Sequence, residues 1–320
     1  MKGVNLMNRK GYLYALISSV LLGFMAILVK IVLDRGVPVT DVIFFRFLLA
    51  SAVLLIYLKI RGASLRVDRW QLLLLMLTGL VGYGVMNLCY YGAFLFISVG
   101  MASMIHFIYP VVAVFFSWLF YRNRFAAKIH IAAGFAVVGA MLISLSELGN
   151  FHWQGIVLAV LAGVFYGLCA ALMEHPRLKV LSGTVVVFYL SVFAFLFMLA
   201  GDLVRGRHPL EHMTLSSFGI MVVVAAICTV FALILFRNSI VYIGSVRATI
   251  LSTMEPVSAA LLGAVLLWES LDFWFGVGSL LVLVSVFLVT KDHTVSESEV
   301  LQADLPSEPQ SSNVASSKDG

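Results

Sequence analysis

Long apolar runs separated by short polar stretches dominate the chain. A helix needs about 20 apolar residues to cross the hydrocarbon core of a bilayer. Ten runs meet or approach this length, and they lie at about 11–33, 40–58, 70–92, 98–120, 128–146, 153–174, 182–203, 215–236, 243–268 and 272–290. We therefore expect an all-α integral membrane protein with ten transmembrane helices.

The two ends of the chain differ from these runs. Residues 1–10 are partly basic and lead into the first run, with no small-residue cleavage site after it, so we expect a spanning helix there and not a signal peptide. From Lys291 onward Ser, Glu, Pro and Lys predominate. Such a segment buries no core, so we expect residues 291–320 to form a disordered tail.

The composition agrees with a lipid environment. Of the 320 residues 62% are hydrophobic and only 12% are charged, which leaves a soluble protein too few polar side chains to cover its surface. The net charge of +5 does not indicate a nucleic-acid partner, because the basic residues lie between apolar runs. The three cysteines lie inside such runs and are not expected to form disulfides: Cys89, Cys169 and Cys228.

The distribution of basic residues predicts an orientation. If the N-terminus is cytoplasmic and ten helices cross the membrane, sixteen Lys and Arg residues lie on the cytoplasmic side. Three lie outside, namely Arg35, Arg205 and Arg207. This bias follows the positive-inside rule. We therefore expect a multi-pass membrane protein with both termini in the cytoplasm.

An internal repeat divides the chain. Ser98–Asn123 aligns without a gap with Gly244–Glu269, 146 positions later, so Tyr109 meets Glu255 and each is followed by a proline. Earlier in each half, Gly23 meets Gly167 at an offset of 144.

The repeat predicts how the halves insert. Each half has five predicted spans, and an odd number forces the second half to insert upside down relative to the first. The sequence therefore predicts two inverted five-helix repeats, over residues 11–150 and 151–290.

Three segments resemble a known family. They are LLGFMAILVK (21–30), FFRFLLA (44–50) and MEPVSAALLGAVLLWE (254–269), and they resemble EamA-type members of the drug/metabolite transporter superfamily. The resemblance covers about 11–290. It implies a bacterial inner-membrane transporter with two five-helix repeats, often an exporter of amino acids or other small metabolites. Glu269 keeps an acidic residue of the family pattern, whereas Asn123 replaces it in the first half.

Glu255 is the foremost candidate for chemistry. It lies midway along the run 243–268, with Ser252 and Ser258 three residues to either side on the same helix face. Pro256 lacks a backbone donor and frees the carbonyl of Ser252. Charges inside a membrane are costly and are usually functional. The group suits an ammonium ion or a proton; the alternative is a protonated Glu that is hydrogen-bonded within the bundle.

The first half offers the matching position. Pro110 frees the carbonyl of His106, and His106 lies one turn from Tyr109 on the same face. The pseudo-two-fold axis would place this kink opposite Glu255, where the two rings could stack on a substrate. The alternative is ordinary packing of an apolar helix.

Two further polar residues lie within apolar runs. Arg46 could grip a substrate carboxylate. It could equally form an ion pair with Asp41 or Asp34, or reach the interface. Asn87 must find a hydrogen bond and so faces the bundle or a cavity. Lys30 is expected to be an interfacial charge or a partner of Asp34, and substrate binding is the alternative.

One short motif suggests a different class of protein. His208-Pro-Leu-Glu211-His212 matches the H-x-x-E-H pattern of inverted zinc peptidases, although no third ligand is apparent nearby. An intramembrane enzyme or metal-dependent sensor is therefore one alternative, and a passive channel is another. No phosphate-binding loop indicates ATP hydrolysis.

The sequence favours a secondary active transporter of small organic metabolites that works by alternating access, and the resemblance implies export of amino acids or related compounds. We expect no enzymatic activity and no cofactor or metal. Its expected partners are a small-molecule substrate and the lipid bilayer, and a homodimer is left open. The expected binding residues are Glu255, His106, Tyr109, Arg46, Ser252 and Asn87, with helix kinks at Pro110 and Pro256.

Overall fold

The computed structural model describes residues 2–93, 95–97, 102, 105–122, 125–143, 152–206, 212–266 and 273–290. These residues form helices and connecting turns, with no strand among them. The predicted tail at 291–320 lies outside the described part of the chain, so its expected disorder stays a prediction.

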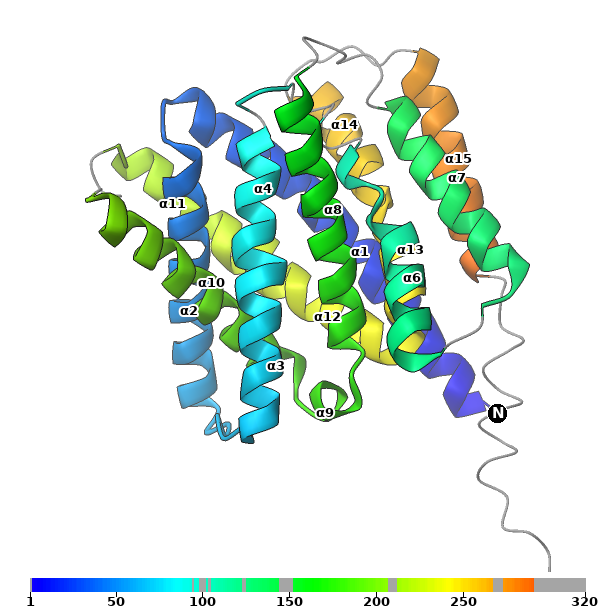
Figure 1. Ribbon diagram of the computed structural model, residues 1–320, viewed down its shortest axis with the longest axis horizontal. Coiled ribbons are helices and arrows are strands. Elements are labelled where there is room, and N and C mark those ends of the chain that lie inside the picture. The colour runs from blue at the N-terminus through cyan, green and yellow to red at the C-terminus, as the bar shows by residue number, and fades with distance from the viewer. Residues whose placement is uncertain are drawn as a thin grey trace, which may run out of the picture.

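The helices follow one another along the chain as predicted from the apolar runs (Figure 1). In order they are α1 (Lys2–Asp34), α2 (Val39–Ile60), α3 (Arg69–Gly79), η1 (Leu80–Val85), α4 (Met86–Ala93), α6 (Tyr109–Tyr121), α7 (Ala127–Ile143), α8 (Trp153–Met173), α9 (Pro176–Lys179), α10 (Gly183–Arg205), α11 (Leu215–Val223), η3 (Val224–Phe231), α12 (Ala232–Ile243), α13 (Ser245–Ser252), α14 (Met254–Leu266) and α15 (Phe273–Thr290). The segments η1 and η3 are π-helical.

In the described part of the chain, six helical stretches are long and apolar enough to cross a membrane. They are Arg9–Asp34, Val39–Ile60, Arg69–Ala93, Trp153–Met173, Gly183–Arg205 and Leu215–Ile243. The other four predicted runs contain the shorter or interrupted helices α6, α7, α13 with α14, and α15. The all-helical class is thus confirmed, while the number of ten spans stays a prediction.

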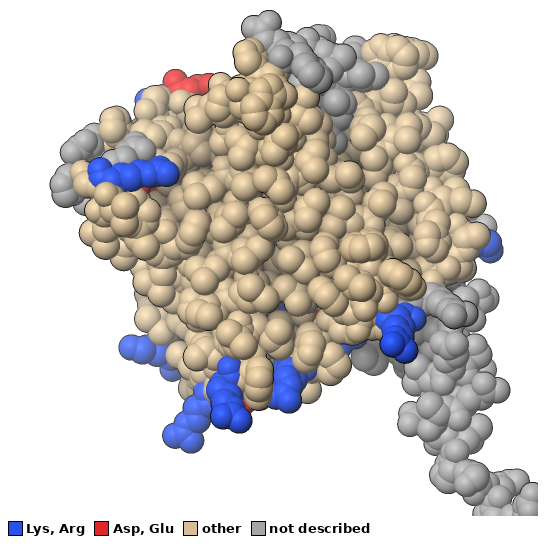
Figure 2. Space-filling view, viewed as in Figure 1, with Lys and Arg blue, Asp and Glu red and all other residues tan. Residues whose placement is uncertain are grey.

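The surface suits contact with lipid. Large apolar side chains are exposed on helix after helix, for example Leu73 of α3, Phe115 of α6 and Leu283 of α15. In Figure 2, Lys and Arg side chains gather mainly at the lower edge, near the ends of α2 and α3 and near α9, and the described residues in the middle of this face show no charge. A broad apolar band between charged edges is what a bilayer requires.

Two opposite faces of the helix bundle are named after residues at them. The Asp202 face is where α10 ends and α2 begins, and it includes Asp202. The Arg177 face is where α3 begins beside α9, and it includes Arg177. Under the predicted orientation the Arg177 face is cytoplasmic.

The first helix of each half packs mainly on the other half. Helix α1 contacts α12, α13 and α14, whereas α8 contacts α4 and α6. Helices α2 and α10 also pack on each other across the halves, and α7 packs along α15 (Figure 1). The repeat visible in the sequence therefore does not correspond to a separate packing unit, because each half contributes its first helix to the opposite side.

The contacts of α1 with α14 and of α8 with α6 involve glycines at matched positions of the repeat. A Cβ on Gly23 of α1 would lie 2.8 Å from the carbonyl oxygen of Glu255. A Cβ on Gly167 of α8 would lie 2.9 Å from the carbonyl oxygen of Tyr109. Both pairs occupy matched positions of the repeat. Only glycine permits such close backbone approach.

The helices that carry the two prolines are interrupted at matched positions. Thr253 forms a turn between α13 and α14, and Phe107, 146 positions earlier, lies in a turn just before α6. The breaks fall about one turn before Pro256 and Pro110. Proline has no N–H to donate to the carbonyl four residues back, and its ring clashes with that carbonyl, so the helix is interrupted there. The predicted kinks are therefore breaks, and the prolines lie within the first turn of the helices that follow.

Candidate functional site

Glu255 lies at the start of α14, directly after the break. It is partly exposed toward the interior of the bundle, and its carboxylate makes no hydrogen bond or ion pair with any described residue. The alternative in which Glu255 is hydrogen-bonded within the bundle finds no partner among these residues. A carboxylate without a partner at this depth is available to a ligand.

The residues around the break supply further oxygen atoms. The Ser252 hydroxyl donates to the carbonyl oxygens of Ala248 (3.0 Å) and Thr249 (3.2 Å) in its own helix. Its lone pairs remain free to accept. The buried Tyr109 hydroxyl faces Ser252 but makes no hydrogen bond of ordinary geometry with a described residue. The two broken helices therefore meet here, and Tyr109 lies within electrostatic range of Glu255.

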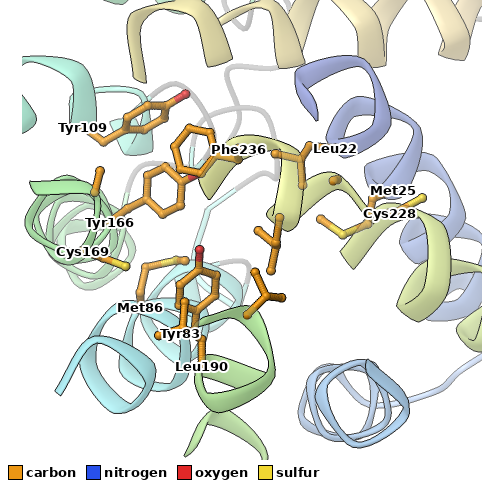
Figure 3. Packing of buried hydrophobic residues seen from close by; sticks show 14 of the residues in the cluster. Leu22, Met25, Tyr83, Met86, Tyr109, Tyr166, Cys169, Leu190, Cys228 and Phe236 are labelled. Atoms are coloured by element: carbon orange, nitrogen blue, oxygen red, sulfur yellow. The ribbon is translucent and has the colours of Figure 1, made fainter. Parts of the chain in front are cut away.

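Five rings form an aromatic cluster beside this point, and Figure 3 shows three of them together in the core. Tyr109 contacts Tyr166 edge-on with ring centroids 4.8 Å apart, and it lies 5.4 Å from His106. His106 is 4.6 Å from Tyr90, and Tyr166 stacks on Phe236 at 6.0 Å. The His106 Nδ1 atom is buried without a hydrogen-bond partner in the described part of the chain.

Arg46 reaches the same interior from α2. Its Nε donates to the Thr229 hydroxyl at 3.0 Å, and its guanidinium lies 5.0 Å from the centroid of the Phe47 ring. Arg46 is 5% exposed, and its charge acts on Glu255. The alternative ion pair of Arg46 with Asp41 or Asp34 is not formed among the described residues, and Asp41 instead lies beside His212.

Asn87 is buried in α4, directly after the π-helical segment η1. Its Nδ2 donates to the carbonyl of Tyr83 at 2.6 Å. As expected for a membrane interior, this polar side chain has a hydrogen bond and faces the bundle. The bond is within its own helix, so the amide oxygen stays open to other donors.

Several candidates lie wholly or partly outside the described residues. These are the Lys30 side chain, His208, Glu211, Glu269 and Asn123. His212 is described, and its Nδ1 lies 3.7 Å from the Asp41 carboxylate. The zinc-peptidase alternative thus gains no supporting geometry.

Three residues at or near this site were not predicted from the sequence. Tyr166 supplies a wall of the cluster, Thr229 anchors Arg46, and Arg237, expected at the cytoplasmic surface, is fully buried. The Nη2 of Arg237 donates to the carbonyl of Leu178 at 2.6 Å. Tyr166 directly precedes Gly167, the glycine that the repeat matches with Gly23, and this neighbourhood is the signal that could have found it.

This fold and interior define a membrane transporter: helices long and apolar enough to cross a bilayer, matched broken helices, and a carboxylate that has no partner among the described residues where they meet. The EamA-like transporter family model matches residues 9–145 and again residues 153–291. The chain therefore belongs to the EamA-like transporter family, and it is a multi-pass membrane protein.

Individual relatives are named as transporters. The pseudopaline exporter CntI of Pseudomonas aeruginosa is 29% identical over 158 residues, which span 48% of this chain and only 54% of the exporter. The uncharacterized inner membrane transporter YicL of Salmonella typhimurium is 27% identical over 302 residues, covering 89% and 96% of the two chains. The biotin transporter of Escherichia coli is 23% identical over 250 residues, covering 76% and 81%.

A solved crystal structure shares the fold. It superposes with a TM-score of 0.72 at 16% identity and covers 88% of this chain and 96% of its own. At this identity the likeness concerns the arrangement of helices alone.

Proposed function

We propose that the protein is a secondary active transporter that exports small organic metabolites such as amino acids by alternating access. The observation that carries the proposal is the Glu255 carboxylate at the break between α13 and α14, which has no partner in the described part of the chain and lies within electrostatic range of Tyr109 and Tyr166 in the aromatic cluster. A solute bound there would lie where α6, which packs on α8, meets α13, which packs on α1.

The polar groups suit a solute with an amine at one end and a carboxylate at the other. Glu255 would accept an ammonium group or carry a proton, and Arg46 would hold a carboxylate. Tyr109, Tyr166 and His106 would cover the apolar part of the solute. Because Arg46 is already held by Thr229, its position is fixed before the solute arrives.

The breaks at Phe107–Ile108 and Thr253 are the proposed bending points. The backbone N–H groups of Ile108 and Thr253 each donate to the carbonyl three residues back, at 3.2 Å, instead of four back as in a regular α-helix. A change of backbone angle therefore costs less there than within a regular helix. Hydrogen bonds between elements at the Arg177 face support a closed state on that side. Gln71 donates to the carbonyl of Arg177 at 3.1 Å, and Glu174 accepts from the hydroxyl of Ser245 at 2.6 Å.

The proposed direction and orientation of transport draw on the relatives and on the charge distribution. One relative is named an exporter and another a biotin transporter, which favours a small organic solute without identifying it. We propose that the Arg177 face is cytoplasmic, in keeping with the exposed basic residues near it, Lys59, Arg61 and Arg69.

The test compares proton-coupled flux of the wild type and Glu255→Gln in proteoliposomes. The solute is the one that raises the melting temperature most in a thermal-shift screen of amino acids and related metabolites. We expect proton-coupled flux to fall by about tenfold or more, because the variant cannot exchange a proton at residue 255. Exchange of solute for solute is expected to persist. The melting temperature of the variant serves as the control for folding.

Coupled flux at the wild-type level in Glu255→Gln would end the proposal. Flux that never saturates and is indifferent to this substitution would instead indicate a passive channel.

A further inference from the structure

A pocket lies at the Asp202 face, away from the broken helices. It has a volume of about 350 Å³ and is formed by α2, α4 and α10, with Thr40, Leu88, Phe197, Met198, Asp202 and Arg205 in its lining. The volume lies at the lower end of the range for small-molecule sites. The site around Glu255, Tyr109 and Arg46 is called the central site below, and none of its residues lines this pocket.

Asp202 is the feature of this pocket that needs an explanation. The residue belongs to the lining of the pocket, yet it is only 5% exposed. The Oδ2 atom is buried without a hydrogen-bond partner, and no described residue forms an ion pair with it. Buried charges are normally paired, because removing an unpaired carboxylate from water is costly. A cationic group in the pocket would supply the missing partner.

Thr40 offers a second oxygen atom to the same group. Its hydroxyl donates to the Asp41 carboxylate at 3.2 Å, so its lone pairs remain available to accept a hydrogen bond. A carboxylate and a hydroxyl oxygen together suit an ammonium group, which carries three donors. Hard metal cations prefer six or more oxygen ligands, whereas this pocket is lined largely by carbon.

The remaining lining determines the rest of the ligand. Leu88, Phe197 and Met198 form an apolar wall. Arg205 lies three residues after Asp202, so both point to one side of α10, and Arg205 is exposed at the rim. An exposed guanidinium next to a buried carboxylate matches the two charges of an amino acid.

We propose that this pocket binds a small zwitterion with an apolar side chain, its ammonium on Asp202 and Thr40 and its carboxylate on Arg205. The pocket also adjoins the side of the central site that Arg46 and Asn87 form. Thr40 is six residues from Arg46 on α2, about 9 Å along the helix axis at about 1.5 Å per residue, and Leu88 follows Asn87 on α4. Its role as a vestibule to the central site rests on the proposed function, whereas the binding itself does not.

Isothermal titration of the purified full-length protein in detergent tests the proposal with three matched probes. These are leucine, isoamylamine, which lacks the carboxylate, and 4-methylpentanoate, which lacks the amine. Leucine and isoamylamine are expected to bind, and Asp202→Asn should weaken both by about tenfold or more. Arg205→Gln should weaken leucine alone. No binding of either amine to the wild type, or equal binding to Asp202→Asn, overturns the proposal.

A second variant fills the pocket and keeps the charge. Gly201 lines the pocket, and a Cβ added there would have no atom within 4 Å, so Gly201→Leu fits the fold and should occlude leucine. Gly219→Leu is the matched control, since Gly219 is an equally open helical glycine outside the pocket. If the part of leucine binding that depends on Asp202 survives Gly201→Leu, or falls equally in the control, the assignment is contradicted.

Two further measurements distinguish this pocket from an inorganic cation site and from the central site. If Asp202-dependent binding of ²²Na⁺ occurs and isoamylamine does not compete, the pocket is an inorganic cation site and the proposal fails. Loss of leucine binding in Asp202→Asn together with wild-type coupled flux in Glu255→Gln would leave this pocket standing while rejecting the proposed function of Glu255.

Discussion

Buried polar residues in this protein fall into two groups according to their partners. Ser252, Ser258 and Asn87 bond to carbonyls of their own helices, which satisfies them without tying helices together. Arg46 bonds across helices, while the Glu255 carboxylate has no partner among the described residues. Local bonds of the first kind could be expected from residue type alone, whereas the partner of Arg46 depends on which helix lies opposite it.

The Arg46–Thr229 hydrogen bond makes a prediction about stability. Thr229→Val removes the acceptor at nearly constant volume and leaves a buried guanidinium with one donor unpaired. We expect a loss of about 1.5–3 kcal/mol in the free energy of unfolding, as for hydrogen bonds to charged groups. Chemical denaturation in detergent measures it. Thr78→Val is the control, because the Thr78 hydroxyl donates to the carbonyl of Leu74 in its own helix; an equal loss in both variants would show that the cross-helix bond adds nothing.

Asp68 predicts a pH dependence at the Arg177 face. It caps α3 by accepting from the backbone N–H groups of Gln71 (2.8 Å) and Trp70 (2.6 Å). The hydrogen bond from Gln71, followed by that from Trp70 and the charge of Arg177, lowers the pKa of this carboxyl below its usual value. Because the folded-state pKa is the lower one, the stabilisation is present above the unfolded-state pKa and is lost as the pH falls through the folded value.

The measurement compares the melting temperatures of wild type, Asp68→Ala and Asp68→Asn. Near neutral pH Asp68→Ala should melt lower, and Asp68→Asn, which can still cap the helix, should lie nearer to the wild type. The gap between wild type and Asp68→Ala should close in acid, below the usual pKa of an aspartate. A gap that is independent of pH would assign the effect to something other than the ionised cap.

At the level of helices, the sequence located the interruptions by their prolines and by the repeat. It did not place the breaks one turn earlier, at Thr253 and Phe107–Ile108, because the displaced hydrogen bond belongs to a residue four positions back. The π-helical segments η1 and η3 also occupy matched places in the two halves, 144 positions apart at their starts. No residue pattern marks them beforehand, since a π-bulge depends on tertiary packing.

The exchanged glycine contacts predict the cost of a single methyl group. Gly167→Ala would place a Cβ 2.8 Å from the Cβ of Val112 and 2.9 Å from the carbonyl oxygen of Tyr109, so α8 must move away from α6. We expect a loss of about 1–3 kcal/mol in stability, typical of overpacking. Gly134→Ala is the matched control, because that helical position is open, and it should be neutral or slightly stabilising. Similar losses in both would mean that the close contact is not needed.

At the scale of the whole molecule, the two halves are interlocked. Hydrophobic runs predicted the order of the helices, but neither they nor the repeat could predict that α1 packs on α12–α14 and α8 on α4 and α6. All of these helices present apolar faces of similar composition, so the sequence does not distinguish one partner from another. The choice is made by shape, as at Gly23 and Gly167.

Interlocking predicts that neither half is stable alone. Expressed separately, residues 1–150 would leave α1 without the helices on which it packs, and residues 151–290 would leave α8 equally exposed. Co-expressed halves should form a complex that resists limited proteolysis, whereas each half alone should be degraded. A single half that is monodisperse and resistant would show that α1 or α8 can pack within its own repeat.

Glu255 and Tyr109 occupy the same position in two copies of one repeat, yet one is an acid and the other a phenol. Had both copies kept the same residue, a bound molecule could lie in either of two symmetry-related poses with equal energy. Because the two residues differ, the two poses differ in energy, with an acid at one end of the site and a phenol at the other. In the proposed transporter, divergence between the copies would select which end of a bound solute points toward α14 and which toward α6.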